Sequence, residues 1–249
     1  MLCAARRFTL LTASLLAAAG APSALFHGPP HRPQAPPTGA IAGNVVLSRA
    51  ITTRRPQIRL YSDFGPGQVP PARSAVPNEL LNVVVYIDSA PLPPASRRGQ
   101  PAPAIRQQNE AFVPHVLVVP VGTRVEFPNE DPFFHNVFSL SQSKSFDLGR
   151  YPKGQSKAVV FDRPGIVQVF CHIHSDMSAI VLVRPNPYFA MPDSTGQFRI
   201  SDVPPGTYRL VGWHERANPV VHEVRVVAGQ TTRVDFNIPV TEPPGRGEN

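Results

Sequence analysis

Proline is the feature that most restricts how this chain can fold. The sequence holds 31 prolines among 249 residues, about 12%, against a usual content of roughly 5%. Proline fixes φ and lacks a backbone N–H, so it breaks helices and is kept out of central strands. A mainly helical fold is therefore nearly excluded, whereas a hydrophobic content of 42% is enough for a buried core. We predict an all-β protein of one or two domains.

The first residues are typical of an export signal. A short basic start precedes an apolar run over residues 8–20, which is too short to cross a bilayer comfortably, and small residues follow it. We interpret residues 1–24 as a signal peptide and predict a periplasmic or secreted protein. No later segment is long and apolar enough for a membrane helix.

Export changes what the two cysteines can do. Cleavage of the signal peptide would remove Cys3 and leave Cys171 alone in an oxidising compartment, where cysteines usually occur in pairs. An intramolecular disulfide is then impossible. Cys171 is left as a buried inert thiol, as half of an intermolecular disulfide, or as a metal ligand.

Short β-rich segments follow one another along the rest of the chain. Residues 25–38 and 91–104 are interpreted as linkers, and the Arg-, Pro- and Gly-rich residues 48–77 as a long exposed insertion. Short strands at this spacing favour an antiparallel sandwich or barrel. Apolar runs predict strands at residues 41–47, 81–87, 116–119, 124–127, 136–138, 158–161, 166–170, 180–183, 197–200, 208–213, 220–227 and 232–238.

One segment carries the residue types of a metal site. Cys171, His174 and Met177 stand at the spacing C-x2-H-x2-M, and His135 lies upstream. Copper that cycles between Cu(I) and Cu(II) favours two imidazoles and a thiolate in a plane, with a weak axial thioether. A β-sandwich can place three such ligands in the loop after one strand and the fourth on a neighbouring strand. The ordinary alternatives are a buried thiol, a polar histidine and a core methionine.

Residues 105–186 resemble the cupredoxins, the type 1 blue-copper proteins. The ligand loop is similar to that of amicyanin, and His135-Asn136 matches the family's first histidine ligand and the asparagine after it. The segments 112–114, 122–127 and 165–167 also match in order. The resemblance implies a Greek-key sandwich that binds one type 1 copper per chain. It implies the ligands His135, Cys171, His174 and Met177, with Asn136 supporting the ligand loops from outside the ligand set.

The flanking segments resemble a different sandwich, the carboxypeptidase-regulatory-like (transthyretin-like) domain. The strand-like residues 43–47 and 82–87 are similar to its first strands, and residues 196–210 to its later ones. We hypothesise a single split sandwich, residues 39–92 plus 188–240, with the cupredoxin domain, 105–186, inserted and residues 241–249 as a tail. Such fusions also resemble periplasmic methylamine-utilisation-type proteins, a likeness that does not establish a methylamine substrate.

These observations predict a non-enzymatic carrier of single electrons between periplasmic redox proteins. An apolar rim of Pro132, Phe133 and Phe134 beside His174 would dock the partner. The alternative is a copper-binding or delivery module without a redox role, in which the second sandwich recognises another protein or a glycan. The sequence holds no Ser-His-Asp order, zinc-protease helix or phosphate loop.

An enzymatic role would require a second metal. His172, beside Cys171, could bind a second copper, as the equivalent residue does in copper nitrite reductases and multicopper oxidases. The chain offers no further H-x-H pair for such a centre, so we predict an exposed or hydrogen-bonded strand residue instead.

The other polar residues are expected to have ordinary roles. We predict a solvated turn at Glu130 and Asp131, and structural or surface roles for His214 and His222. Residues 39–104 hold seven basic and three acidic residues, so much of the net charge of +7 lies there. Together with export, this argues against nucleic acid and favours an acidic partner or surface.

Overall fold

The computed structural model describes residues 37–48, 78–92 and 102–240 except Ser175. In these residues the regular structure is β-strand apart from one 3-10 helix, η1 (Glu79–Asn82), so the all-β prediction is confirmed. The predicted signal peptide, nearly all of the insertion and the tail lie outside the described residues. The strands are β1 (Gly39–Leu47), β2 (Val84–Ile87), β3 (Arg106–Gln107), β4 (Phe112–Val113), β5 (Val116–Pro120), β6 (Thr123–Pro128), β7 (His135–Ser141), β8 (Lys144–Tyr151), β9 (Ser156–Phe161), β10 (Gly165–Phe170), β11 (Ser178–Arg184), β12 (Phe189–Ala190), β13 (Gln197–Val203), β14 (Gly206–Trp213), β15 (Val220–Val226), β16 (Thr231–Arg233) and β17 (Phe236–Ile238).

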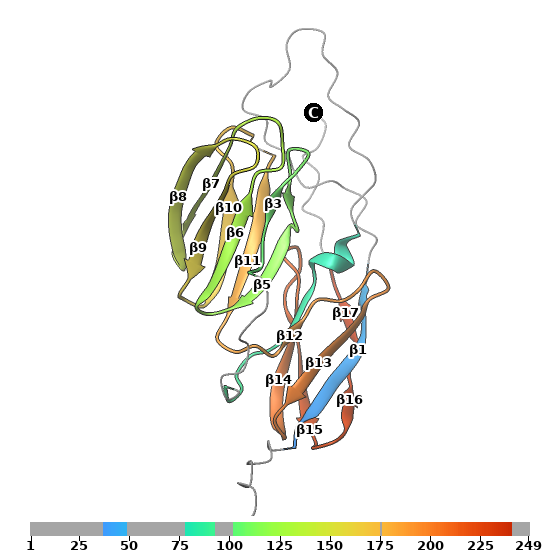
Figure 1. Ribbon diagram of the computed structural model, residues 1–249. Helices are drawn as coiled ribbons and strands as arrows, with labels where there is room; N and C mark the ends of the chain where they lie inside the picture. The colour runs from blue at the N-terminus through green and yellow to red at the C-terminus, as the bar shows by residue number, and fades with distance from the viewer. Residues whose placement is uncertain (1–36, 49–77, 93–101, 175, 241–249) are drawn as a thin grey trace, which may run out of the picture. The chain divides into compact units, whose positions relative to one another are not determined.

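Strands from the two ends of the described chain build one sandwich (Figure 1). β1 pairs with β13 in antiparallel fashion, and with β16 and β17 in parallel. The facing sheet has the order β12-β2-β14-β15. Gly39 is the register partner of Val203, and Ile87 that of Leu210. The segments before and after residues 102–186 therefore pair with each other, and the division of the chain into these domains stays a prediction.

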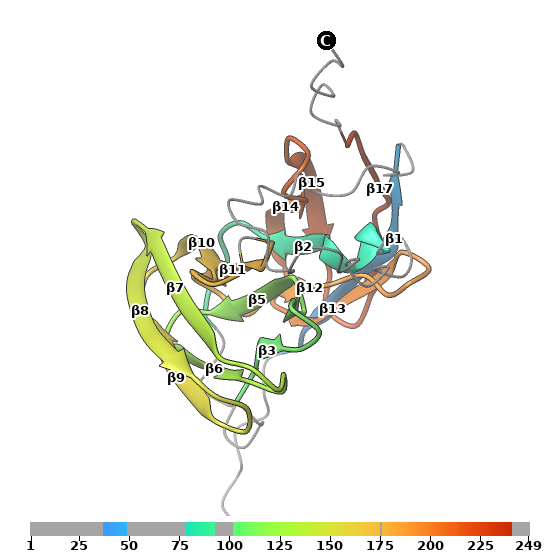
Figure 2. The same cartoon turned by 90° about the horizontal axis from the view of Figure 1, so that it is seen from above.

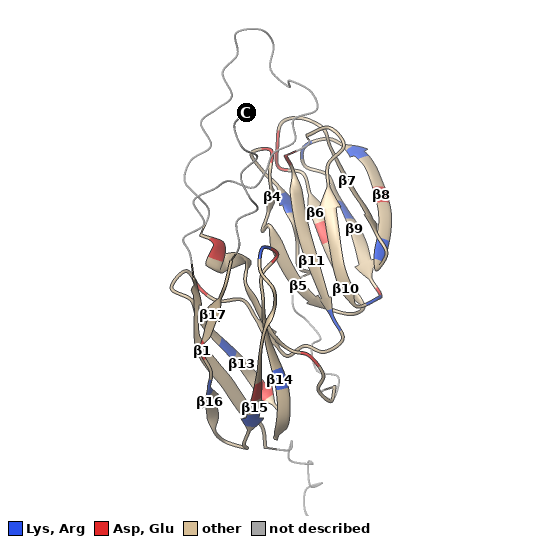
Figure 3. Cartoon of the chain, turned by 180° about the vertical axis from the view of Figure 1, so that it is seen from behind, with Lys and Arg blue, Asp and Glu red and all other residues tan. Residues whose placement is uncertain are grey.

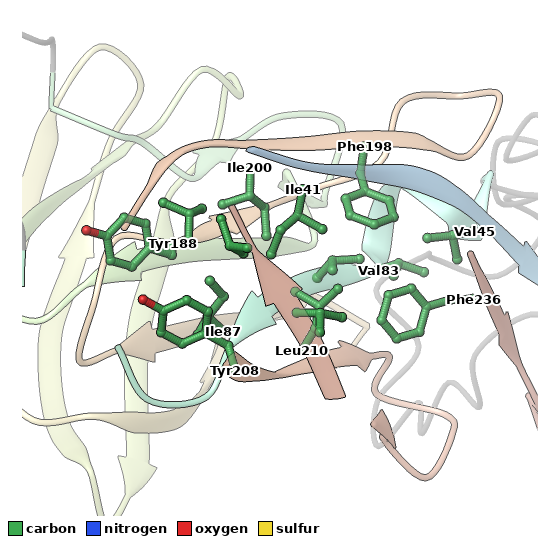
Figure 4. Close-up of a cluster of buried hydrophobic side chains, with 14 of the residues drawn as sticks. Ile41, Val45, Val83, Ile87, Tyr188, Phe198, Ile200, Tyr208, Leu210 and Phe236 are labelled. Atoms are coloured by element: carbon green, nitrogen blue, oxygen red, sulfur yellow. The ribbon is translucent and has the colours of Figure 1, made fainter. Parts of the chain in front are cut away.

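The core of this outer sandwich lies between the two sheets (Figure 4). Ile41 and Phe198, from β1 and β13, belong to the same buried cluster as Ile87 and Leu210, from β2 and β14. Each fully buried side chain of this size stabilises the fold by roughly 1.5–3 kcal/mol. Glycine at position 212 leaves room for Phe236, because a Cβ there would lie 2.7 Å from its ring.

The intervening residues form a second sandwich, seen from above in Figure 2. Its main sheet has the order β5-β11-β10-β7-β8, and the pairs β6-β9 and β3-β4 complete it. β11 runs antiparallel to β10 and parallel to β5. The core contains Phe127, Phe161 and Val169, and it also includes Cys171 and Met177. The predicted metal-binding segment thus borders the hydrophobic core.

β11 is buried on both faces. Ala179, Val181 and Val183 point into the second sandwich, whereas Ile180 and Leu182 belong to a separate apolar cluster with residues of the outer sandwich. Alternate side chains of a strand point to opposite faces, so one strand serves both clusters. No charged residue occurs in β5 or along β11 before Arg184 (Figure 3). The separate cluster consists of Val84, Tyr86, Val116, Val118, Ile180, Leu182, Val211 and Trp213.

Some strand limits differ from those predicted. The prediction of a strand over residues 81–87 is wrong at its start, because residues 79–82 form η1, which Asn78 caps through its side-chain oxygen and the N–H of Leu80 (3.1 Å). The segment 232–238 is interrupted between β16 and β17, where the carboxylate of Asp235 accepts a hydrogen bond from the N–H of Asn44. No helix in the described residues is long and apolar enough to cross a membrane.

Candidate metal centre

Three neighbouring strands bring the predicted ligands to one end of the second sandwich. His135 is the first residue of β7, Cys171 directly follows β10, and Met177 directly precedes β11. Phe170 pairs with Phe138 on β7 and with Ser178 on β11, so the ends of these strands lie side by side. The two ends of the ligand loop are thereby fixed by ladder pairs.

The side chains of His135, Cys171 and His174 form a compact triangle. Sγ of Cys171 lies 4.0 Å from Nδ1 of His135 and 3.9 Å from Nδ1 of His174, and the two Nδ1 atoms are 3.0 Å apart. Among the described residues, this is the group of histidine, cysteine and acidic side chains that could hold a metal ion. A thiolate with two imidazole nitrogens is typical of a type 1 copper site.

Met177 follows His174 by three residues and is buried in the same hydrophobic cluster as Cys171. Its backbone N–H donates to the carbonyl of His174 (3.1 Å), and its own carbonyl accepts from the N–H of Cys171 (3.3 Å). The methionine side chain is buried in the same cluster as Cys171. The loop is therefore closed on itself, with a soft thioether on its buried side.

The surroundings of Cys171 lower the pKa of its thiol. Burial raises its pKa, but hydrogen bonds from His135, His174 and the backbone N–H groups of Asn136 and His174 outweigh burial and lower the pKa to about 5. The thiolate is the form that binds metal. The interpretation of Cys171 as an inert buried thiol does not fit this environment.

Asp131 has a different role from the one predicted. The expectation of a solvated turn at Asp131 is wrong, because its carboxylate is buried and accepts hydrogen bonds from Nε2 of His135 (2.8 Å) and from the N–H groups of Asn109 (2.6 Å) and Glu110 (2.9 Å). Burial raises the pKa of Asp131, and these hydrogen bonds together lower it below its ordinary value. Glu130 pairs with Arg106 at a partly exposed position.

The bond to Asp131 settles which nitrogen of His135 can bind metal. A carboxylate only accepts, so Nε2 of His135 carries a proton, and Nδ1 is the nitrogen left to bind a metal. Nδ1 faces Cys171 and His174. A carboxylate behind a histidine is a common support of metal sites. The donor set and its orientation therefore fit a bound copper ion.

Asn136 is buried beside the ligands and contacts them through its backbone. Its N–H bonds the sulfur of Cys171, while its side chain donates to the carboxylate of Asp147 on β8 (2.7 Å). Asp147 also accepts from the N–H of Gly149. The side chain of Asn136 thus connects β7 with β8, and its support of the ligand loops remains a prediction.

Tyr151 is a further buried residue near the site. It is the register partner of His135 and donates its hydroxyl hydrogen to the carbonyl of Phe127 (2.8 Å), while accepting from the amide of Gln107 (2.7 Å). Burial raises the pKa of this phenol. Tyr151 therefore stays neutral and fixes the end of β8 next to His135.

The other histidines of the described residues take no part in the triangle. His172 is largely exposed and stacks on Phe138, with ring centres 3.7 Å apart. His214 is buried, with Nε2 3.4 Å from a carboxylate oxygen of Glu79. His222 lies with its ring against Phe236.

The side of the site formed by His174 is the less buried one. His135 and Cys171 are buried, whereas His174 is half-buried. The ring centre of Phe133 is 5.3 Å from that of His135 and 5.7 Å from that of His174. Phe133 and its neighbour Phe134 expose 38% and 55% of their surface. An apolar rim thus lies next to the predicted ligands.

No protein-family model matches the chain, and no curated protein matches it either. Parts of the chain are similar to solved structures. The copper-containing nitrite reductase NirK from Thermus scotoductus SA-01 is 28% identical over 37% of this chain, with a TM-score of 0.32, and the match spans 25% of that enzyme's length. A purple cupredoxin from Nitrosopumilus maritimus is 25% identical over 32% of this chain and 98% of its own, with a TM-score of 0.30. A methionine-to-alanine mutant of amicyanin in its Cu(I) form is 20% identical over 40% of this chain and 98% of its own, with a TM-score of 0.33.

Proposed function

We propose that this protein is an exported type 1 copper protein of the cupredoxin kind that carries single electrons between redox partners. The observation that supports the proposal is the triangle of Nδ1 of His135, Sγ of Cys171 and Nδ1 of His174. We assign these three groups as the equatorial ligands and Met177 as the weak axial ligand.

Copper bound in this triangle would supply a one-electron couple between Cu(I) and Cu(II). The task of the chain is to hold the donors in one arrangement for both states. Asp131 fixes the ring of His135, and the backbone bonds of Met177 close the loop around Cys171. Burial of His135 and Cys171 keeps water away from the donors. Little rearrangement then accompanies the gain or loss of an electron.

The exposed rim formed by Phe133 and Phe134 is proposed as the docking surface for the partner. The half-buried ring of His174 offers the shortest route between the ligand set and this surface. Electron-transfer encounters are weak and small, below roughly 1,200 Å² in total. The two aromatic side chains beside His174 would form the centre of such an encounter. The basic residues of 39–104 favour an acidic partner.

A metal analysis combined with a visible spectrum tests this proposal. Copper-loaded protein should be intensely blue with about one copper per chain, and Cys171→Ser should remove the colour, because the thiolate gives rise to it. His172→Ala is the matched control and should keep the colour. Colourless protein that binds only zinc would overturn the proposal.

A second measurement separates an electron carrier from a copper-delivery module. Rapid oxidation of a small reduced cytochrome by the Cu(II) protein, with copper retained, supports the carrier. Inertness toward the electron donor, combined with release of copper to an apoprotein acceptor, would favour delivery. Two coppers per chain would instead point to an enzyme with a second centre.

A further inference from the structure

We propose that the outer sandwich sets the position of the axial ligand Met177 through a polar bridge formed by His115 and Glu215. This inference rests on the copper site proposed above. It assigns the two residues as positioning residues, although neither is a ligand, and it gives the outer sandwich a direct influence on the properties of the metal.

The bridge consists of three groups in line. Nδ1 of His115 lies 2.9 Å from the carbonyl oxygen of Ser178, and Nε2 lies 3.1 and 3.2 Å from the two carboxylate oxygens of Glu215. His115 precedes β5 in the second sandwich, whereas Glu215 follows β14 of the outer one. The ring of His115 therefore has a polar partner at each of its two nitrogens and is held from both sides.

The bridge acts on the residue next to the axial ligand. Ser178 directly follows Met177, whose carbonyl is bonded to the N–H of Cys171. The carbonyl of His115 also accepts from the N–H of Ile180 (2.7 Å). The chain just beyond Met177 is therefore held at two points by one histidine, and Glu215 fixes the orientation of that histidine.

Beyond the bridge, apolar side chains of the outer sandwich pack against β11. Ile180 and Leu182 share a buried cluster with Trp213 and Tyr86 of the outer sandwich. At the far end, Arg184 pairs with Asp88 (3.2 Å) and lies over the ring of Tyr86 (3.6 Å). The outer sandwich thus contacts β11 along its length, and the bridge lies at the end next to the metal ligands.

The chain offers a matched control for the bridge. Glu215 and Asp88 are both carboxylates of the outer sandwich that contact a side chain of the second sandwich, His115 and Arg184 respectively. Asp88 meets β11 at Arg184, about 20 Å from Ser178 at the usual rise per residue of a strand. Each substitution removes a carboxylate from a contact between the two sandwiches, but only Glu215 is connected to Met177, through His115 and Ser178.

The test compares Glu215→Ala, Glu215→Gln, Asp88→Ala and His115→Leu in the full copper-loaded chain. A loosened axial thioether disfavours Cu(II), which gains more from each donor than Cu(I). We expect Glu215→Ala and His115→Leu to shift the affinity ratio toward Cu(I) by about threefold to tenfold, a tenfold change corresponding to about 59 mV in reduction potential. The Cu(II) electron paramagnetic resonance spectrum should change in parallel.

The variant Glu215→Gln separates positioning from charge. Its amide can still bond Nε2 of His115, so a positioning role predicts values close to those of the unaltered protein. Equal shifts in Glu215→Ala and Glu215→Gln would reveal a charge effect and overturn the proposal. Equal shifts in Glu215→Ala and Asp88→Ala, or no shift in either Glu215→Ala or His115→Leu, would overturn it as well.

A second readout does not depend on the metal. In the metal-free protein, Glu215→Ala and His115→Leu should speed hydrogen exchange at the amides of Cys171, Met177 and Ile180 by about fivefold or more relative to Asp88→Ala. Unchanged exchange would overturn the bridge whatever the metal. If the unaltered protein never turns blue, the proposed function fails, and the exchange data alone decide on the bridge.

Discussion

The carboxylate of Asp131 and the imidazole of His135 are joined by a 2.8 Å hydrogen bond, and both groups are buried. Two backbone N–H groups, those of Asn109 and Glu110, hold the same carboxylate from the other side. Both of these residues have a left-handed backbone, with φ of 54°, which aims their N–H groups at one point. His135 is therefore oriented by a loop that lies more than twenty residues upstream.

Replacement of Asp131 by asparagine should weaken copper binding. The carboxylate faces three N–H donors, whereas an amide has only one acceptor atom and would turn its NH2 group toward one of them. We expect the affinity for copper to fall by about 10–100-fold, the usual effect of such a support. Competition with a chelator of known affinity measures it. Glu130→Gln, at the neighbouring exposed residue, should bind copper as the unaltered protein does.

The thiol of Cys171 should titrate far below an ordinary thiol. In metal-free protein, the ultraviolet absorption of the thiolate should appear with a midpoint near pH 5, in line with its pKa of about 5. The thiol of a free cysteine has a pKa of about 8.5. Cys171→Ser should lack this step. A midpoint near about pH 8 would show that the histidines do not stabilise the thiolate.

The same pKa shift links stability to pH. Because the folded-state pKa lies below that of the unfolded chain, the thiolate stabilises the metal-free fold fully above the unfolded pKa, and this contribution is lost as the pH falls toward about 5. The difference in free energy of unfolding between the unaltered protein and Cys171→Ser should therefore shrink on acidification. Denaturant unfolding at several pH values measures it, and a constant difference would contradict the shift.

The aromatic rim should govern the rate of electron exchange without affecting the copper itself. Phe134→Glu places a charge on the exposed rim, and we expect exchange with a physiological or cytochrome partner to slow by about tenfold. The reduction potential and the visible spectrum should stay unchanged. Leu140→Glu is the control, since Leu140 is 81% exposed on β7. Equal slowing in both variants would mean that the partner docks elsewhere.

The apolar cluster shared by the two sandwiches should make them unfold together. Leu182→Ala removes a buried side chain from that cluster and should lower the free energy of unfolding by about 2–5 kcal/mol. Leu140→Ala, at an exposed position, should change it by no more than about 0.5 kcal/mol. Calorimetry should show one transition for the unaltered protein. Two separate transitions would show that the cluster does not couple the sandwiches.

The strands that the sequence predicts correctly are those with strong apolar alternation or continuous apolar runs. β11, with the sequence SAIVLVR, is the clearest case, because burial on both faces produces an unbroken hydrophobic run. The sequence predictions omit β8, because only Phe146 and Leu148 carry its apolar alternation, and at the edge of the sheet both are only partly buried. The predicted strand start at residue 81 fails for a local reason, the cap that Asn78 provides for η1.

Some residues of the metal centre can be predicted from the sequence and others cannot. The spacing of Cys171, His174 and Met177 is visible in the sequence because all three lie in one loop. The burial of Asp131 is not visible, because Asn-Glu-Asp-Pro is a typical turn composition. Only the distant residues 109 and 110 convert that turn into a support for the first histidine. The bridge through His115 and Glu215 likewise joins residues one hundred positions apart.

The pairing of β1 with β13, β16 and β17 affects the order in which the chain can fold. β1 is the first of the described strands, yet its partners lie near the other end, so β1 stays unpaired until those distant residues reach it. β10 and β11, by contrast, are joined by one short loop and can form a local unit at once. The second sandwich is therefore expected to fold ahead of the outer one, and the exposed edges of β1 and β2 need shielding until their partner strands pair with them.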